Sequence, residues 1–104
     1  MIRSELEHTL ASNAAELRRM HVARLHAFGS LVRKEAGPES DIDLLVEFDE
    51  AVDLFDFVAV QDRLSELLGS KVDLVTRPAL HPRLRERILS EAVQVFGAAF
   101  NAAA

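Results

Sequence analysis

Two aspartates stand one residue apart in a stretch that alternates like a β-strand. Asp41 and Asp43 flank Ile42, and on a strand their side chains leave the same face about 6.5 Å apart along the chain. Neighbouring carboxylates repel each other, and a divalent cation between them reverses that repulsion. Oxygen ligands in a chain without cysteine favour Mg²⁺ or Mn²⁺ over zinc. The pair therefore indicates a metal site, with a solvated acidic strand as the simpler alternative.

A third carboxylate lies on a later predicted strand. Asp73 stands between Val72 and Leu74, so its side chain points away from their apolar face. If this strand pairs beside that of Asp41 and Asp43, the three acids share one side of the sheet. A single strand aspartate is usually a surface residue, so the prediction depends on all three converging.

The dipeptide Gly29-Ser30 follows another predicted strand and leads into a short turn that carries Arg33. A glycine lets the backbone approach a ligand closely, and the free N–H groups of a following turn attract a phosphate. Taken alone, the dipeptide is more often a plain turn than a phosphate site.

The elements that must position these residues follow from the spacing of apolar side chains. Helices are predicted at residues 4–20, 53–68 and 82–91, and strands at 22–28, 41–48 and 71–75, with one short helical turn after Ser30. The order predicts an α/β or α+β domain in which helices pack against a small mixed β-sheet.

Several residues mark where the helices begin, end and pack. Ser4 and Glu7 have the spacing of a capping box, Asp53 can cap the second helix, and Gly69 can end it. In the last helix, Leu84 is one of three apolar residues expected to point inward, with Ile88 and Leu89.

Length and composition exclude several classes of protein. The 104 residues predict one domain spanning 1–104, with about 97–104 as a frayed tail. Twelve Lys and Arg against 17 Asp and Glu give a net charge of −5, which argues against sequence-independent binding of nucleic acid. The chain has no cysteine for a disulfide, and no apolar run approaches the ~20 residues that span a bilayer. We expect a cytoplasmic protein that does not enter a membrane.

Gly29-Ser30-Leu31-Val32-Arg33, followed by Ser40-Asp41-Ile42-Asp43-Leu44-Leu45-Val46, resembles the signature of the DNA polymerase β-like nucleotidyltransferase superfamily. The compact chain is similar to its minimal nucleotidyltransferase branch, and the resemblance covers most of the chain. It implies the nucleotidyltransferase fold. Lys34 departs from the pattern, because family members often carry glycine there.

The resemblance also implies roles for the three acids. Asp41 and Asp43 would hold two Mg²⁺ ions, or Mn²⁺, on the triphosphate of ATP. Asp73 would bind one of the metals and help deprotonate the acceptor hydroxyl.

The same resemblance assigns the nucleotide's phosphates to the Gly-Ser segment and its surroundings. Gly29, Ser30, Arg33 and Ser40 would bind the nucleotide. His26 is a further candidate beside this site.

Minimal members of the family commonly resemble the antitoxin half of a two-protein pair whose other half is an all-helical HEPN toxin. This implies that the chain transfers AMP from ATP to a toxin tyrosine. The alternative is a non-catalytic antitoxin that masks its partner, for which Leu45, Phe55 and Phe100 are candidate exposed contacts. The sequence leaves the oligomeric state open.

Nucleic-acid binding ranks third among the hypotheses. Its basis is a basic cluster near the last helix, formed by Arg77, Arg83, Arg85 and Arg87. The simpler interpretation is a solvated helix face, because Arg83 and Arg87 lie four residues apart and Glu91 is available to pair one turn later. In the functional interpretation these arginines contact nucleotide phosphates or an acidic partner.

Overall fold

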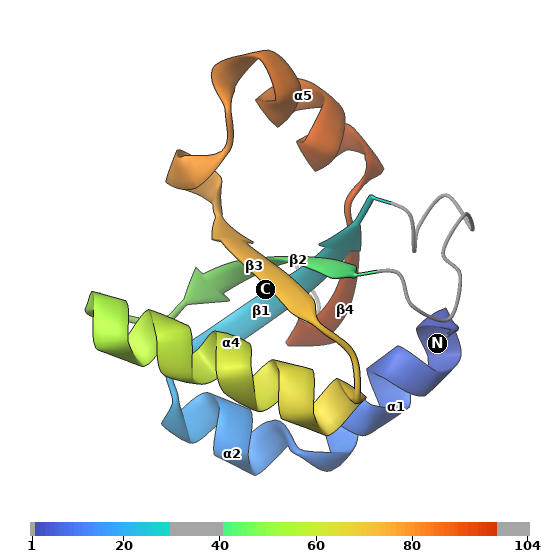
Figure 1. The fold of residues 1–104 in the computed structure, drawn as a ribbon, viewed down its shortest axis with the longest axis vertical. Helices are drawn as coiled ribbons and strands as arrows, with labels where there is room; N and C mark the ends of the chain where they lie inside the picture. The colour runs from blue at the N-terminus through green and yellow to red at the C-terminus, as the bar shows by residue number, and fades with distance from the viewer. Residues whose placement is uncertain (1, 30–40, 98–104) are drawn as a thin grey trace, which may run out of the picture.

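The computed structural model describes residues 2–29 and 41–97, which form helices grouped around one sheet (Figure 1). The helices are α1 (Arg3–Ser12), α2 (Ala14–Arg19), α4 (Leu54–Leu68) and α5 (Pro82–Glu91), together with the 3-10 helix η1 (Arg77–Ala79). The strands are β1 (Val22–Phe28), β2 (Ile42–Phe48), β3 (Val72–Thr76) and β4 (Val93–Gly97). This arrangement confirms the predicted α+β class.

The four strands form a mixed sheet in the order β3-β2-β1-β4. Strand β1 is antiparallel to both β2 and β4, whereas β2 and β3 are parallel. A parallel pair needs a long crossover connection, and α4 provides it between β2 and β3. The predicted small mixed sheet is therefore confirmed.

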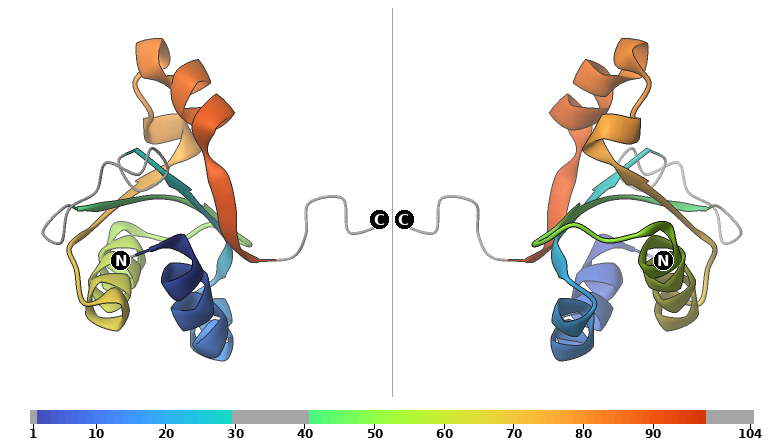
Figure 2. Two further views of the ribbon diagram at one scale, coloured as in Figure 1. Left: turned by 90° about the vertical axis from the view of Figure 1, so that its right-hand side faces the viewer. Right: turned by 90° about the vertical axis from the view of Figure 1, so that its left-hand side faces the viewer.

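The two faces of the sheet are covered differently. Helices α1, α2 and α4 lie together on one face, and α5 stands on the other (Figure 2). The apolar core lies between the sheet and the first three helices, and its fully buried members include Leu6, Leu10, Leu17, Leu25, Leu44 and Leu64. Because strand side chains alternate, the residues between the core positions of β2 and β3 point to the face of α5.

The two residues predicted to cap and to end α4 do so. The Asp53 carboxylate accepts a hydrogen bond from the backbone N–H of Asp56 at 2.8 Å, which caps the first turn. Gly69 ends the helix with φ 66°, a left-handed conformation that costs glycine little.

The first helix differs from its prediction in two ways. It begins at Arg3, and Glu5 accepts a hydrogen bond from the backbone N–H of Ile2 at 3.4 Å, so the capping box expected at Ser4 and Glu7 is wrong. The helix also breaks at Asn13, whose side-chain amide donates to the Thr9 carbonyl at 2.8 Å. Asparagine competes in this way with the helical hydrogen bonds of the backbone.

The end of the chain contains a strand that the sequence did not indicate. Strand β4 pairs with β1 and continues to Gly97, the residue at which the tail was expected to begin; residues 98–104 lie outside the described part. Across the described ranges, 2–29 and 41–97, no helix is both long enough and apolar enough to cross a membrane.

Candidate active site

The sheet register brings Asp73 next to Asp43. The two residues are Cα partners in the parallel pair of β2 and β3, so their side chains leave the same face of the sheet. Asp41 immediately precedes β2, and the backbone N–H of Ile42 donates to the Lys71 carbonyl at 2.9 Å, which aligns the starts of the two strands. The three predicted acids are thus placed on neighbouring strands, on the face of α5.

The three carboxylates share a face but stand apart from one another. Among the residues the structure describes, the group of three potential ligands whose atoms all lie within 4.8 Å of one another is His21, Asp49 and Glu50. The oxygen atoms of the three aspartates are therefore not all within 4.8 Å of one another. Asp41 Oδ2 lies 3.9 Å from Lys71 Nζ, an exposed ion pair of the kind that stabilises little and yields easily.

Gly29 ends β1 directly against Asp43. Its φ of 73° is left-handed, and a Cβ atom built on it would overlap the Asp43 carboxylate and lie 3.2 Å from its Cγ. The backbone N–H of Gly29 donates to Glu91 Oε1 of α5 at 3.2 Å. The close approach that glycine permits is therefore made to a catalytic candidate, Asp43. The turn whose N–H groups were expected to attract a phosphate lies outside the described residues.

Ser30, Arg33 and Ser40 lie outside the described residues, as does Lys34. The assignment of Ser30, Arg33 and Ser40 to the nucleotide stays a prediction.

A hollow of about 280 Å³ opens between the ends of β1 and β2 and one face of α5. It is lined by Phe28, Gly29, Asp43, Leu84, Arg87, Ile88 and Glu91. The four residues from α5 follow a helical spacing of three or four, so they belong to a single helix face. This hollow is the candidate active site.

Apart from the arginines, the residues that α5 contributes to the site were missed from the sequence. Leu84 was expected in the core, yet its side chain is 49% exposed and none of the residues of α5 is fully buried. Leucine and isoleucine at this spacing have the pattern of a core helix, and the sequence alone does not show that the facing space is open.

His26, predicted beside the site, lies near the hollow but does not line it. It pairs with Leu45, two residues along from the pairing of Phe28 with Asp43. Burial lowers the pKa of His26 below its usual 6.5, an effect that Glu47 opposes and that Arg77 and Arg24 reinforce. Within the described residues its buried Nδ1 has no hydrogen-bond partner.

The basic cluster does not form a continuous cationic patch. Arg77 pairs with Glu47 at 3.2 Å, and the Arg85 guanidinium donates to the Leu80 carbonyl at 3.4 Å. Arg83 and Arg87 project from α5, and only Arg87 of the four lines the candidate active site.

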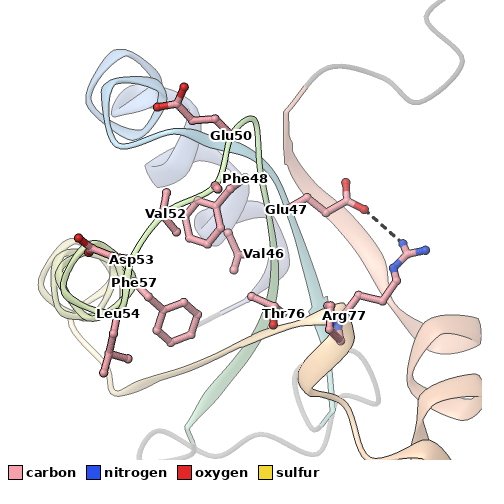
Figure 3. A pocket seen from close by; sticks show the side chains of 12 residues that line it. Val46, Glu47, Phe48, Glu50, Val52, Asp53, Leu54, Phe57, Thr76 and Arg77 are labelled. Carbon is pink, nitrogen blue, oxygen red and sulfur yellow. Dashed lines mark hydrogen bonds and ion pairs between the residues drawn. The ribbon is translucent and has the colours of Figure 1, made fainter.

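A second hollow lies at the opposite ends of β2 and β3. Its volume is about 440 Å³, and Val46, Phe48, Phe57, Thr76 and Arg77 are among its lining residues (Figure 3). The rings of Phe48 and Phe57 meet edge to face at 6.4 Å. None of the predicted catalytic residues lines it, so it is separate from the candidate active site.

The mixed four-stranded sheet and its helices agree with the nucleotidyltransferase fold that the sequence resemblance implied. A model of the nucleotidyltransferase domain family matches residues 11–95. The chain belongs to this family and is an enzyme of the nucleotidyltransferase class.

Two relatives that carry the name protein adenylyltransferase match most of the chain. The protein adenylyltransferase MntA of Thermococcus cleftensis is 40% identical over 92 residues, covering 88% of this chain and 93% of that protein. The inferred protein adenylyltransferase MJ0435 of Methanocaldococcus jannaschii is 49% identical over 74 residues, covering 71% of this chain and 80% of that protein.

Solved structures share the fold. One described as a minimal nucleotidyltransferase is 39% identical with a TM-score of 0.75, covering 89% of this chain and 95% of that one. An MNT antitoxin in complex with a tri-AMPylated HEPN toxin of Shewanella oneidensis matches with 21% identity and a TM-score of 0.65, covering 93% and 74% of the two chains.

Proposed function

We propose that this chain is the antitoxin of a toxin–antitoxin pair and transfers AMP from ATP to a tyrosine hydroxyl of a HEPN toxin. The observation that carries the proposal is the pairing of Asp43 with Asp73 beside Gly29, at the mouth of a hollow large enough for part of a nucleotide. The protein adenylyltransferase assignment of the Thermococcus relative supports the choice of AMP and of a protein acceptor.

The donor set fits magnesium or manganese. Asp43 and Asp73 lie on adjacent strands about 4.8 Å apart and offer only oxygen atoms, which hard cations prefer. Asp41 can join them at the cost of a weak exposed contact to Lys71. Two bound cations would neutralise charge on the attacking and leaving oxygens.

The proposed reaction forms one bond, breaks another and transfers one proton. The acceptor oxygen forms a bond to the α-phosphorus, the bond to the bridging oxygen of the pyrophosphate breaks, and Asp73 receives the hydroxyl proton. Asp73 is exposed on β3, an edge strand of the sheet, so a hydroxyl carried by another protein can reach it. Positioning of the two reactants supplies much of the rate in such transfers.

The identity of the partner is inferred from relatives. The Shewanella complex pairs an MNT antitoxin with a modified HEPN toxin. AMP as the transferred group and a HEPN toxin as the acceptor follow by analogy with it. A tyrosine hydroxyl, ATP as donor and the cytoplasm as the site of action rest on the family resemblance of the sequence.

The test is transfer of label from ATP to the toxin. The chain, its cognate HEPN toxin, Mg²⁺ and α-labelled ATP should give labelled toxin, and Asp43→Asn should abolish the label. Asp62→Asn is the matched control, because Asp62 is an exposed acid on α4, remote from the hollow, and it should label the toxin at the wild-type rate. Unlabelled toxin with folded wild-type protein would contradict the proposal.

A second function, masking of the partner without catalysis, is favoured by one surface. Leu54 and Phe55 at the start of α4 are 72% and 83% exposed, beside the second hollow. Of the contacts suggested from the sequence, Phe55 is exposed as expected, Leu45 is wrong because it is buried, and Phe100 lies outside the described residues. Protection of cells by the double variant Asp41→Ala/Asp43→Ala would favour masking.

A further inference from the structure

The described residues that line the hollow include two acidic side chains and one basic side chain. Of the described residues that line it, Asp43 and Glu91 are acidic and Arg87 alone is basic. Asp73 adds a third carboxylate beside Asp43. A polyphosphate that enters this space is stabilised by positive charge beside it, and among the described lining residues Arg87 is the one that can provide it.

Arg87 is free to take this role. Within the part of the chain that the structure describes, no residue accepts a hydrogen bond from its guanidinium or pairs with it. Arg77 and Arg85, by contrast, already contact Glu47 and the Leu80 carbonyl. An unpaired guanidinium at the wall of a hollow offers the planar pair of donors that binds phosphate oxygens two at a time.

Glu91 fixes where this cation stands. It lies one turn after Arg87 on the same face of α5, and Oε1 accepts the backbone N–H of Gly29 at 3.2 Å. Helix α5 has no fully buried residue, so this contact is one of the few that set its distance from the ends of β1 and β2. The same bond therefore aligns Arg87 with Asp43.

We propose that Arg87 binds the polyphosphate of the nucleotide and that Glu91 is a positioning residue, which holds α5 against Gly29. The proposal rests on the proposed function, because it takes the hollow as the nucleotide site. It adds a phosphate ligand from the last helix, outside the Gly-Ser and aspartate motifs.

The test compares two arginines of one helix. Arg87→Gln and Arg83→Gln both remove an exposed charge from α5, but only Arg87 lines the hollow. Binding of a non-hydrolysable ATP analogue and of tripolyphosphate, each with Mg²⁺, is measured by calorimetry. We expect Arg87→Gln to weaken both by about tenfold or more, the loss typical of a charge-assisted hydrogen bond, and Arg83→Gln to match the wild type.

A third variant separates charge from geometry. Arg87→Lys keeps the charge without the planar donor pair, so its affinity should fall between those of Arg87→Gln and the wild type. Thermal unfolding should be the same for all four proteins. Equal affinities of Arg87→Gln and Arg83→Gln would overturn this inference alone, whereas a wild-type chain that binds no analogue would overturn the proposed function with it.

Discussion

One face of the sheet is packed with leucine and valine under three helices, whereas the other carries the candidate catalytic aspartates as well as the buried Leu45, with α5 and η1 on it. Leu44 and Val46 of β2 are buried against α1, α2 and α4. Asp43 and Asp41, which precede them in the chain, leave the opposite face, the one on which α5 stands (Figure 2). No residue of α5 is fully buried. The same strand thus serves both faces by alternation.

The difference between the faces separates stability from chemistry. Apolar burial supplies most of the folding free energy, and it is concentrated on the face of α1, α2 and α4. The face of α5 gathers carboxylates that repel one another, a cost that the packed face offsets. Substitutions on the two faces should therefore change different properties.

The largest effect on stability is expected on the packed face. Leu44→Ala removes a fully buried side chain and leaves a cavity, so the free energy of unfolding should fall by about 2–5 kcal/mol. Leu84→Ala makes the same chemical change on α5 and should cost less than about 1 kcal/mol, because that side chain is half exposed. Urea denaturation measures both, and similar losses would remove the contrast between the faces.

The contact between Gly29 and Asp43 gives the next largest effect. Gly29→Ala meets a left-handed φ and also overlaps the Asp43 carboxylate. Gly69→Ala meets a similar φ of 66° with nothing within 4 Å of the added carbon. Backbone strain should cost each variant about 1–2 kcal/mol, and Gly29→Ala should lose more than Gly69→Ala.

Nucleotide binding distinguishes the same two variants. Gly29→Ala should bind the ATP analogue more weakly, because the added methyl group displaces the Asp43 carboxylate. Gly69→Ala should bind it like the wild type. Equal stability and equal binding in the two variants would show that the contact with Asp43 has no role.

Much of the fold and part of the site could be predicted from local chemistry. Alternation of apolar residues identified β2, and Asp53 and Gly69 marked the ends of α4 because capping depends on a few adjacent atoms. The parallel register that sets Asp43 beside Asp73 is a long-range contact. From the sequence, the three acids were predicted to share one side of the sheet only if their two strands pair.

The failures share a physical reason. Strand β4 has five residues and follows α5 after Ala92 alone, so it offers neither a long alternation nor a turn. Leu45 and Leu84 were misplaced because their exposure depends on what covers the second face. There η1 packs on β2 and Leu45 is buried, while α5 stands away from the sheet and leaves Leu84 at an open hollow.

Asp73→Asn should change the transfer activity without lowering the stability. Removing one of three neighbouring acids relieves repulsion, so stability should stay within about 0.5 kcal/mol of the wild type or rise slightly. Transfer of label to the toxin should be lost, because the amide cannot accept the hydroxyl proton. A strongly destabilised variant, or one that retains full transfer, would contradict the role assigned to Asp73.

The smallest effect concerns pH. Burial lowers the pKa of His26 in the folded state, so the unfolded chain binds the proton more readily. The stability that neutral His26 contributes is therefore complete above pH 6.5 and is lost as the pH falls toward the lowered folded value. Melting temperatures between pH 7.5 and 5.5 should fall less for His26→Gln than for the wild type, and an equal fall would refute this assignment.

The most direct test of the account is a crystal grown with Mn²⁺ and a non-hydrolysable ATP analogue. The anomalous signal of manganese should lie within coordinating distance of Asp43 and Asp73, with Asp41 released from Lys71 and turned toward the same ion. Manganese found only at His21, Asp49 and Glu50, with the analogue away from the hollow of α5, would contradict the placement of the active site.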